Sequence, residues 1–300
     1  MPLPLKAKLE AKMENRIRLM THNVWDSDEN TPAWEARGED CSAAVRVKGL
    51  LRVYKETQPD VIGGQEVSPL MADLLKEGMI AEGLNYTLIW GRCTPIFYRS
   101  DKLELLDSDF GSYPEKIPGF AGVFNDARSK SYSLAVFRSK ENGRCFIFVT
   151  THLWWKKSPT DAASFGNDQY LLGSDEAREY QIAMVLEKIE KYREKYGCPA
   201  VLVGDMNCPY TSLAMKYVRA HGFRHAHDIA TEYAEEAVGY HYCFADGYEK
   251  YYYDRPFETA IDHIYVIGEG EGAVKRFERY SPEYYFPISD HSPAYMDIEF

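Results

Sequence analysis

The feature that most constrains the fold is a series of short apolar runs, each of strand length, that recurs along the 300 residues. These runs are "IRLMTHNVW", "DVIGGQEV", "TLIWG", "TPIFYR", "YSLAVFR", "CFIFVTTHL", "PAVLVGDMN", "AIDHIYVI" and "AYMDIEF". Runs rich in β-branched and aromatic residues, bounded by turn residues, are typical of strands. So many strands with few helices imply two sheets packed on each other. We therefore predict an α+β fold, a sandwich of two mostly antiparallel sheets with helices outside.

Two segments have the period of a helix instead. Near residue 50 the apolar residues recur at i, i+3, i+4 and i+7, which gives one apolar stripe (Val47, Leu50, Leu51 and Tyr54). The clearest helix is "SDEAREYQIAMVLEKIEKYREKYG", for which we predict Ser174 as the N-cap and Gly197 as the end. The polar, aperiodic stretch before it, residues 155–173, predicts a loop, and a loop of this length in a compact domain is usually functional.

Nothing in the composition divides residues 16–300, so we expect one domain there, preceded by an N-terminal extension at residues 1–15. The extension is charged and has no apolar stretch like that of a signal peptide. No apolar run approaches the roughly 18 residues of a membrane span. The six cysteines form no CxxC pair and fit free thiols in a reducing compartment. These features predict a cytoplasmic protein without a membrane span.

The charge balance bears on the partner. The formal net charge is −11 and the isoelectric point is near 5.3. Long duplex DNA is usually bound by clusters of lysine and arginine that displace counterions. Duplex DNA is therefore not expected as the main substrate, although a local basic rim is compatible with the net charge.

Polar residues suited to metal binding or proton transfer occur repeatedly at the ends of the predicted strands. A carboxylate is costly to bury unless it is paired or bound to a metal, and Asp and Asn are poor strand formers. Each short motif alone is more often a turn or a cap. Their recurrence at strand ends favours a single site built from these residues: Asn23, Glu66, His152, Asp205, Asn207, Asp262, Asp290 and His291.

The chain resembles the endonuclease/exonuclease/phosphatase superfamily, whose fold is like that of pancreatic deoxyribonuclease. The matching segments occur in the family's order from residue 20 to residue 295: "MTHNVWD", "DVIGGQE", "TTHLWW", "VLVGDMNCPY", "AIDHIYV" and "ISDHSPAY". The resemblance implies a four-layer α/β/β/α sandwich and hydrolysis of a phosphoester with Mg²⁺ or Mn²⁺. The motif "GDMNCPY" departs from the inositol phosphatase branch and "GQEVSP" from the DNA-repair branch. The chain looks closer to the deadenylase-like and uncharacterised bacterial members.

Matching each position to the family's motifs implies a role for each residue. Glu66 is expected to bind the metal, with Asn23 and Asp290 contributing directly or through water. Asp205 is expected to orient and deprotonate the attacking water. Asn207 is expected to hold that water or a phosphate oxygen. His291 is expected to pair with Asp262 and carry a positive charge toward the phosphate, because a carboxylate raises the proton affinity of an imidazole. His152 is expected to be a second donor.

We expect the loop after His152 to select the substrate. Trp155 and Lys157 lie just beyond a catalytic imidazole, and loops on a rigid scaffold commonly carry specificity. Arg178, on the following helix, is a third candidate substrate-binding residue. The predicted activity is phosphodiester hydrolysis of a small or single-stranded substrate by in-line attack of water.

Alternatives from other classes remain at this stage. The same site would serve a phosphomonoesterase of the sugar or inositol phosphate type. A binding module that kept the fold without activity is disfavoured by the intact acid and histidine set. A zinc hydrolase built on His221, His225 and His227 is disfavoured because no HExxH motif or comparable helical pair is present.

Overall fold

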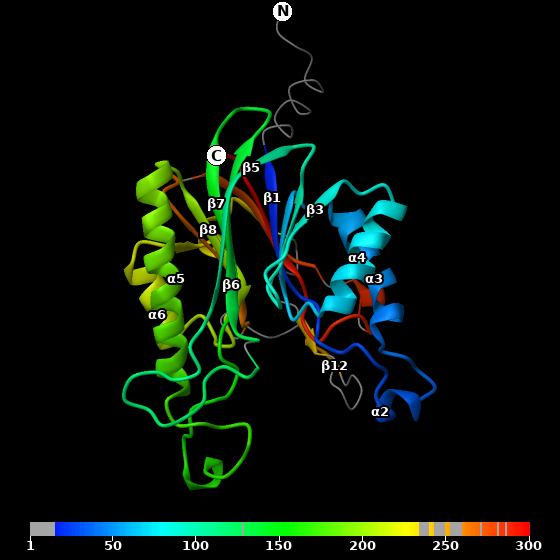
Figure 1. The fold of residues 1–300 in the computed structure, drawn as a ribbon, viewed down its shortest axis with the longest axis vertical. Helices are drawn as coiled ribbons and strands as arrows, with labels where there is room; N and C mark the ends of the chain where they lie inside the picture. Colours follow the sequence, from blue (N-terminus) through cyan, green and yellow to red (C-terminus); the bar gives the residue numbers. More distant parts are fainter. Residues whose placement is uncertain are drawn as a thin grey trace, which may run out of the picture.

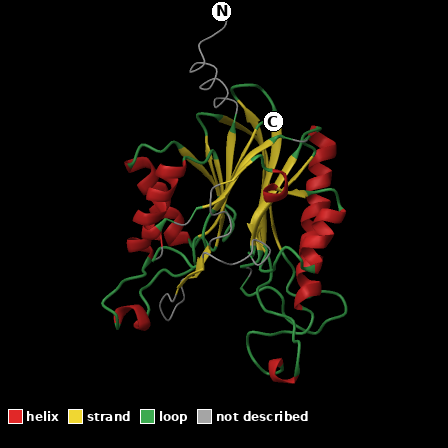
Figure 2. Ribbon diagram, turned by 180° about the vertical axis from the view of Figure 1, so that it is seen from behind, coloured by secondary structure: helices red, strands yellow, loops and turns green. Residues whose placement is uncertain are grey.

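The computed structural model describes residues 16–127, 129–233, 240–242, 250–252, 260–270, 272–280, 282–285 and 287–300. The predicted N-terminal extension, residues 1–15, lies outside them. The strands form two large sheets that pack face to face, and helices cover both outer faces (Figures 1 and 2). This arrangement is the predicted four-layer sandwich.

The seven-stranded sheet has the order β10-β14-β15-β1-β2-β4-β3. Within it, β1 pairs with β2 in parallel and β10 with β14 in parallel, while the other pairings are antiparallel. Its strands are β1 (Ile17–Asn23), β2 (Val61–Gln65), β3 (Tyr86–Ile89), β4 (Ile96–Arg99), β10 (Glu232–Tyr233), β14 (Val274–Arg279) and β15 (Ala294–Ile298).

The six-stranded sheet has the order β5-β6-β7-β8-β13-β9, and only its β7–β8 pairing is parallel. Its strands are β5 (Leu103–Ser112), β6 (Ser131–Ser139), β7 (Cys145–His152), β8 (Ala200–Asp205), β9 (Arg224–His225) and β13 (Asp262–Ile267). A separate antiparallel pair joins β11 (Tyr240–Tyr242) to β12 (Lys250–Tyr252). Both large sheets are thus mostly antiparallel, as predicted, with parallel pairs at the strands that matter most for the site.

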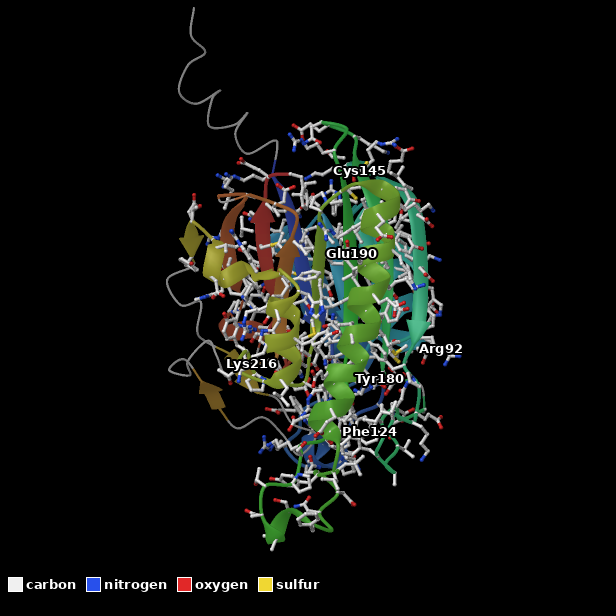
Figure 3. The ribbon with its side chains drawn as sticks, turned by 90° about the vertical axis from the view of Figure 1, so that its left-hand side faces the viewer. Arg92, Phe124, Cys145, Tyr180, Glu190 and Lys216 are labelled. Atoms are coloured by element: carbon white, nitrogen blue, oxygen red, sulfur yellow. The ribbon has the colours of Figure 1, made fainter. Side chains whose placement is uncertain are left out.

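The helices lie in two groups on opposite sides of the sandwich (Figure 1). Figure 3 looks onto α5, with Cys145, the first residue of β7, near one end of the molecule and Phe124 near the other. No helix in the described part of the chain is long and apolar enough to cross a membrane. The helices are α2 (Pro32–Glu35), α3 (Ala43–Thr57), α4 (Pro69–Ala81), α5 (Ser174–Tyr196), α6 (Leu213–Ala220) and α7 (Ala226–Ile229), with 3₁₀ turns η1 (Ala162–Ser164) and η3 (Glu283–Tyr285).

The helix predictions hold except for one cap. Val47, Leu50 and Tyr54 are buried on α3, as the apolar stripe predicts. Ser174 is not the N-cap of α5 but its first residue, and the cap position is Gly173, whose φ of 92° suits glycine. The Ser174 hydroxyl is used elsewhere: it donates to Leu171 O and accepts from an indole N–H. The serine therefore fastens the preceding loop to the helix.

The main core lies between the two sheets and fixes which side chains face inward. On β7 the inward residues include Phe146 and Phe148, and on β8 they include Val201 and Val203, all of which are fully buried. Burial of each such side chain contributes roughly 1.5–3 kcal/mol. Because side chains alternate along a strand, this core also sets the direction of the polar residues at the strand ends.

Candidate active site

The register of the six-stranded sheet places three predicted site residues in one row. His152, the last residue of β7, pairs with Asp205, the last residue of β8, and Asp205 pairs with Asp262, the first residue of β13. His152 is an even number of residues from Phe148 on the same strand, and Asp205 is two residues from Val203. Side chains at such spacings face the same side of a sheet, so both point inward with the core. The row therefore lies at one end of the sandwich and faces the opposite sheet.

The seven-stranded sheet brings the remaining predicted acids and amide to the same end. Asn23 ends β1, and Glu66 directly follows β2, which is parallel to β1. Asp290 and His291 precede β15, which runs antiparallel to β1 and so begins where β1 ends. Asn23 Nδ2 donates to Asp205 Oδ2 at 3.0 Å, which joins the two sheets at the site.

The backbone turns sharply at these strand ends. Glu66, Asn207 and Trp25 have φ values of 56°, 50° and 63°, in the left-handed region that side chains disfavour. Side-chain oxygens hold two of these turns. The Asp26 N–H donates to Glu66 Oε2 at 2.9 Å, and the Asn207 N–H donates to Asp205 Oδ1 at 2.8 Å. Each carboxylate is therefore fixed by a main-chain donor.

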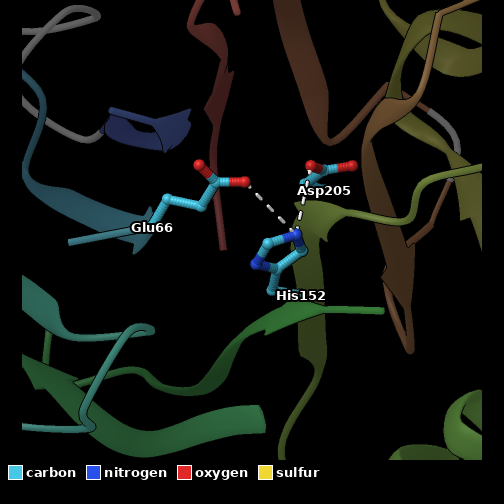
Figure 4. Close-up of side chains that lie close together, drawn as sticks. All are labelled: Glu66, His152 and Asp205. Carbon is cyan, nitrogen blue, oxygen red and sulfur yellow. Dashed lines mark ion pairs between the residues drawn. The ribbon is translucent and has the colours of Figure 1, made fainter. Parts of the chain in front are cut away.

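His152 lies between two of the carboxylates (Figure 4). Its Nε2 is 3.7 Å from Glu66 Oε1 and 3.5 Å from Asp205 Oδ2. Burial, together with the charge of Lys130, holds the pKa of His152 well below its usual range, so the imidazole is neutral. Burial would raise the pKa of Glu66, but the charge of Lys130 and the hydrogen bond from the Asp26 N–H outweigh it and lower that pKa. Glu66 is therefore a carboxylate at any physiological pH.

Lys130 belongs to the site although sequence reasoning missed it. It is 5% exposed, and its Nζ lies 2.7 Å from His152 Nε2. An ammonium has only donors, so this nitrogen of the neutral imidazole accepts the bond. Lys130 precedes Ser131, which starts β6 and pairs with His152. The signal was present, because a polar residue at the edge of "YSLAVFR" follows the same strand-end pattern as the others.

His291 and Asp262 form the predicted imidazole–carboxylate pair. His291 Nδ1 is 2.8 Å from Asp262 Oδ2, and its Nε2 is 3.8 Å from Asp205 Oδ2. Burial opposes a charge on this imidazole, but Asp262, Asp205 and Asp290 raise the pKa of His291 well above its usual range. His291 is therefore an imidazolium that faces the site through Nε2.

The carboxylates are crowded. Burial raises the pKa of Asp205 to about 6 and that of Asp290 to about 7, and the other acids of the site add to both shifts. One oxygen of Asp290 and one of Asp262 (Oδ1 in each) are buried and have no hydrogen-bond partner among the described residues. A buried carboxylate oxygen without a donor is costly. The electrostatics of the site therefore call for a cation.

A divalent ion that prefers oxygen ligands fits this set of residues. Two groups of side chains have ligand atoms close enough to share an ion: Glu66, His152 and Asp205, and Asp205, Asp262 and His291. Mg²⁺ is usually bound by one or two carboxylates and keeps several waters. Since His291 is charged and His152 Nε2 already accepts from Lys130, we place the ion on carboxylates.

The loop of residues 155–173, here called the rim loop, begins next to His152. Trp154 is buried against Phe124, whereas Trp155 is half-buried and donates from Nε1 to Asp126 Oδ2 at 2.9 Å. Lys157 is exposed, and its backbone is bonded to Gln169 and Leu171 across the loop. One tryptophan thus enters the core and the other remains available at the rim.

Arg178 does not reach the site as the predicted contact with substrate requires. It is 4% exposed, and its Nη1 donates to the carbonyls of Trp154 and Lys156 at 3.0 and 2.7 Å. Its Nη2 bonds Asp175 at 2.5 Å. With its donors directed at the loop backbone, Arg178 is placed to hold the rim loop against α5.

The three histidines of the zinc alternative do not converge. His221 is exposed and bonds Tyr217 O, whereas His225 is buried with its Nε2 3.2 Å from His263 Nδ1. Among the described residues, none of the three-ligand groups includes His221, His225 or His227.

These residues at the strand ends, here called the strand-end cluster, lie on an α/β sandwich of two large sheets: Asn23, Glu66, Lys130, His152, Asp205, Asp262, Asp290 and His291. The sequence profile of the Endonuclease/Exonuclease/phosphatase family matches residues 20–291, and the chain belongs to that family. A comparison with curated protein sequences gave no match.

Solved structures with the same fold cover nearly the whole chain. A family protein from Bacteroides thetaiotaomicron has a TM-score of 0.67 at 19% identity, covering 94% of this chain and 97% of its own. The mannosyl-6-phosphatase of the same organism has a TM-score of 0.65 at 20% identity, with coverage of 95% and 100%. The human Nocturnin catalytic domain has a TM-score of 0.57 at 16% identity, with coverage of 94% for both. At these identities the likeness establishes the fold.

Proposed function

We propose that the protein is a Mg²⁺- or Mn²⁺-dependent phosphodiesterase that hydrolyses small or single-stranded phosphoesters. The observation that carries the proposal is the meeting of carboxylates from both sheets with two cationic side chains at one end of the sandwich. Phosphoryl transfer needs charge neutralisation and an aligned nucleophile more than it needs covalent chemistry. Family membership supports the same reaction class.

Each residue has a task that its surroundings support. Glu66, Asn23 and Asp290 hold the ion, which when bound supplies a Lewis acid for a phosphoryl oxygen. Asp205 takes the proton of the attacking water, because a carboxyl with a pKa of about 6 is a competent base near neutrality. Its two hydrogen bonds, from Asn207 N–H and Asn23 Nδ2, fix the direction in which it accepts.

The cations bind the phosphate. His291 is held as an imidazolium by Asp262, so its Nε2–H can donate to an oxygen that gains charge in the transition state. Lys130 supplies a second positive charge, and the neutral His152 accepts a hydrogen bond from its ammonium. This assignment makes Lys130 the direct donor and His152 its orienting partner, in place of the donor role predicted for His152.

A phosphomonoesterase is the second candidate, and Lys130 is the observation that favours it. A monoester dianion carries one more charge than a diester, and a second fixed cation would stabilise that charge selectively. A similar structure is that of a mannosyl-6-phosphatase, which acts on a monoester. Lys130→Ala should then lower kcat/KM for a monoester more than for a diester.

The test compares bis(4-nitrophenyl) phosphate with 4-nitrophenyl phosphate in the presence of Mg²⁺, Mn²⁺, Zn²⁺ or a chelator. Hydrolysis of the diester with Mg²⁺ or Mn²⁺, abolished by the chelator, supports the proposal. Faster hydrolysis of the monoester supports the second candidate. Activity with Zn²⁺ alone would revive the zinc alternative, and no hydrolysis with any ion would favour a binding module.

A further inference from the structure

Arg46 lies behind the strand-end cluster on α3, a helix that contributes no residue to the cluster. Only 2% of its surface is exposed. The guanidinium has five N–H donors in a rigid plane, and it donates five hydrogen bonds to main-chain carbonyls. Nε donates to Cys41 O at 2.8 Å, Nη1 to Val24 O at 2.5 Å and Ile288 O at 2.9 Å, and Nη2 to Trp25 O at 2.9 Å and Ser27 O at 2.7 Å.

Four of the five carbonyls, all but that of Cys41, belong to the segments that carry the candidate metal ligands. Residues 24–27 directly follow Asn23, and backbone N–H groups within them donate to Asn23 Oδ1 at 3.0 Å and to Glu66 Oε2 at 2.9 Å. Ile288 stands two residues before Asp290. A single side chain therefore holds one segment that orients two ligands and another that bears the third.

The same two segments also touch each other at the site. Ser289 Oγ donates to Asn23 O at 2.8 Å, and the His291 N–H donates to Ser289 Oγ at 3.1 Å. The serine joins the segments directly beside the ligands, and Arg46 joins them from behind. The junction is therefore fixed on two sides.

The segment after Asn23 needs this support. Trp25 has a φ of 63°, in the left-handed region that is unfavourable for a residue other than glycine. Arg46 bonds the carbonyl of Trp25, and its guanidinium carbon lies 5.0 Å from the centroid of that indole ring. Arg46 thus holds the strained turn at Trp25. The next residue, Asp26, donates its N–H to Glu66.

We propose that Arg46 is a positioning residue for the metal site: it sets the relative placement of Asn23, Glu66 and Asp290. This inference rests on the proposed function. Lysine is not an equivalent at such a position, because its ammonium has three donors on a flexible stem and cannot span five carbonyls in one plane. Outer partners that orient metal ligands typically change metal affinity or activity by 10- to 100-fold when they are replaced.

The test is Mn²⁺ binding to Arg46→Lys by isothermal titration calorimetry, with electron paramagnetic resonance of free Mn²⁺ as a second readout. We expect the Kd for Mn²⁺ to rise by about 10- to 100-fold in a variant that circular dichroism shows to be folded. In the activity assay, the Mn²⁺ concentration for half-maximal rate should rise in parallel, and saturating Mn²⁺ should recover most of kcat. The matched control is Arg52→Lys on the same helix, an exposed arginine paired with Glu56, which should leave the Kd unchanged.

A folded Arg46→Lys variant with the wild-type Kd would overturn the proposal, because a role limited to fold stability lowers the melting temperature without moving metal affinity. If Arg46→Lys does not fold, Ser289→Ala decides, since it cuts the direct link between the same segments without burying a charge. An unchanged Kd there overturns the proposal, and an increase supports it. A wild type that binds Mn²⁺ but hydrolyses no phosphoester would defeat the proposed function and leave the Arg46 comparison intact. A wild type that binds no Mn²⁺ would defeat both.

Discussion

The strand-end cluster and the rim loop border the same site but are held in different ways. In the cluster, His152 and Asp205 are each 1% exposed and are placed by the register of adjacent strands. In the rim loop, Trp155 is half-buried, Lys157 is exposed and Phe165 is 65% exposed. The loop is attached to the scaffold mainly by side chains of α5.

This difference in attachment matches two functions, catalysis in the cluster and substrate selection in the loop. Groups that act on the phosphate must be held within a fraction of an ångström, and strands with a packed core achieve this. Groups that select a substrate need exposure and can vary, and a loop permits this. Arg178 of α5 illustrates the attachment: its Nη1 donates to Lys156 O at 2.7 Å. We therefore expect the two regions to respond differently to substitution.

The largest effect is expected in the strand-end cluster. Asp205→Asn and His291→Ala should each lower kcat by at least ~10²-fold, the scale of a lost general base or a lost charge-stabilising donor. Both substitutions remove buried charge, so folding is checked by circular dichroism. The loss should be the same for a minimal diester and for a larger substrate. Near-normal turnover in either variant would remove that residue from the mechanism.

A smaller effect, and one confined to the metal, is expected for Glu66→Gln. The carboxylate is the main anionic ligand in our assignment, and the amide cannot replace its charge. The Mg²⁺ concentration for half-maximal rate should rise by roughly 10-fold or more, as for other altered metal sites, while saturating metal restores part of the rate. The measurement is a metal titration of the initial rate. If the titration midpoint does not move, the ligand role passes to Asp290 or Asn23.

The smallest effect, and the most selective, is expected in the rim loop. Stacking of a base on an aromatic side chain contributes ~1–3 kcal/mol, and for a half-buried ring we expect the lower end, about 5-fold in kcat/KM. Trp155→Ala should therefore weaken the preferred substrate by that factor and leave bis(4-nitrophenyl) phosphate almost unchanged. Lys157→Ala should act in the same direction on a substrate with an additional phosphate. Equal losses on both substrates would mean that the loop supports the cluster and does not select.

The parts of the site that follow from strand periodicity could be predicted from sequence. Asp205 ends an apolar run and His152 ends another, and alternation gives each the direction of its core neighbours. The sandwich follows from the number and length of such runs. The resemblance to a family supplied the pairing of His291 with Asp262, because residues 29 apart in sequence have no local signal for contact.

What sequence reasoning missed depends on tertiary contacts. Lys130 precedes β6, and it is the antiparallel pairing of β6 with β7 that brings it to His152. Arg178 was assigned to substrate because the sequence cannot show that residues 154–156 fold back over α5 and take its donors. Ser174 has the composition of a cap, but its hydroxyl bonds the preceding loop, and glycine takes the cap position.

The left-handed residues at the strand ends have a consequence for how this protein tolerates change. Trp25, Glu66 and Asn207 each hold an unfavourable backbone conformation, and such positions cost on the order of 1–3 kcal/mol apiece. Folded domains are stable by only about 5–15 kcal/mol in total. The summed cost at these three residues is therefore comparable with the net stability of a typical domain. Substitutions that weaken the core lower the same small free energy of unfolding. The number of mutations that the chain tolerates is therefore limited by the strain at its site as well as by its packing.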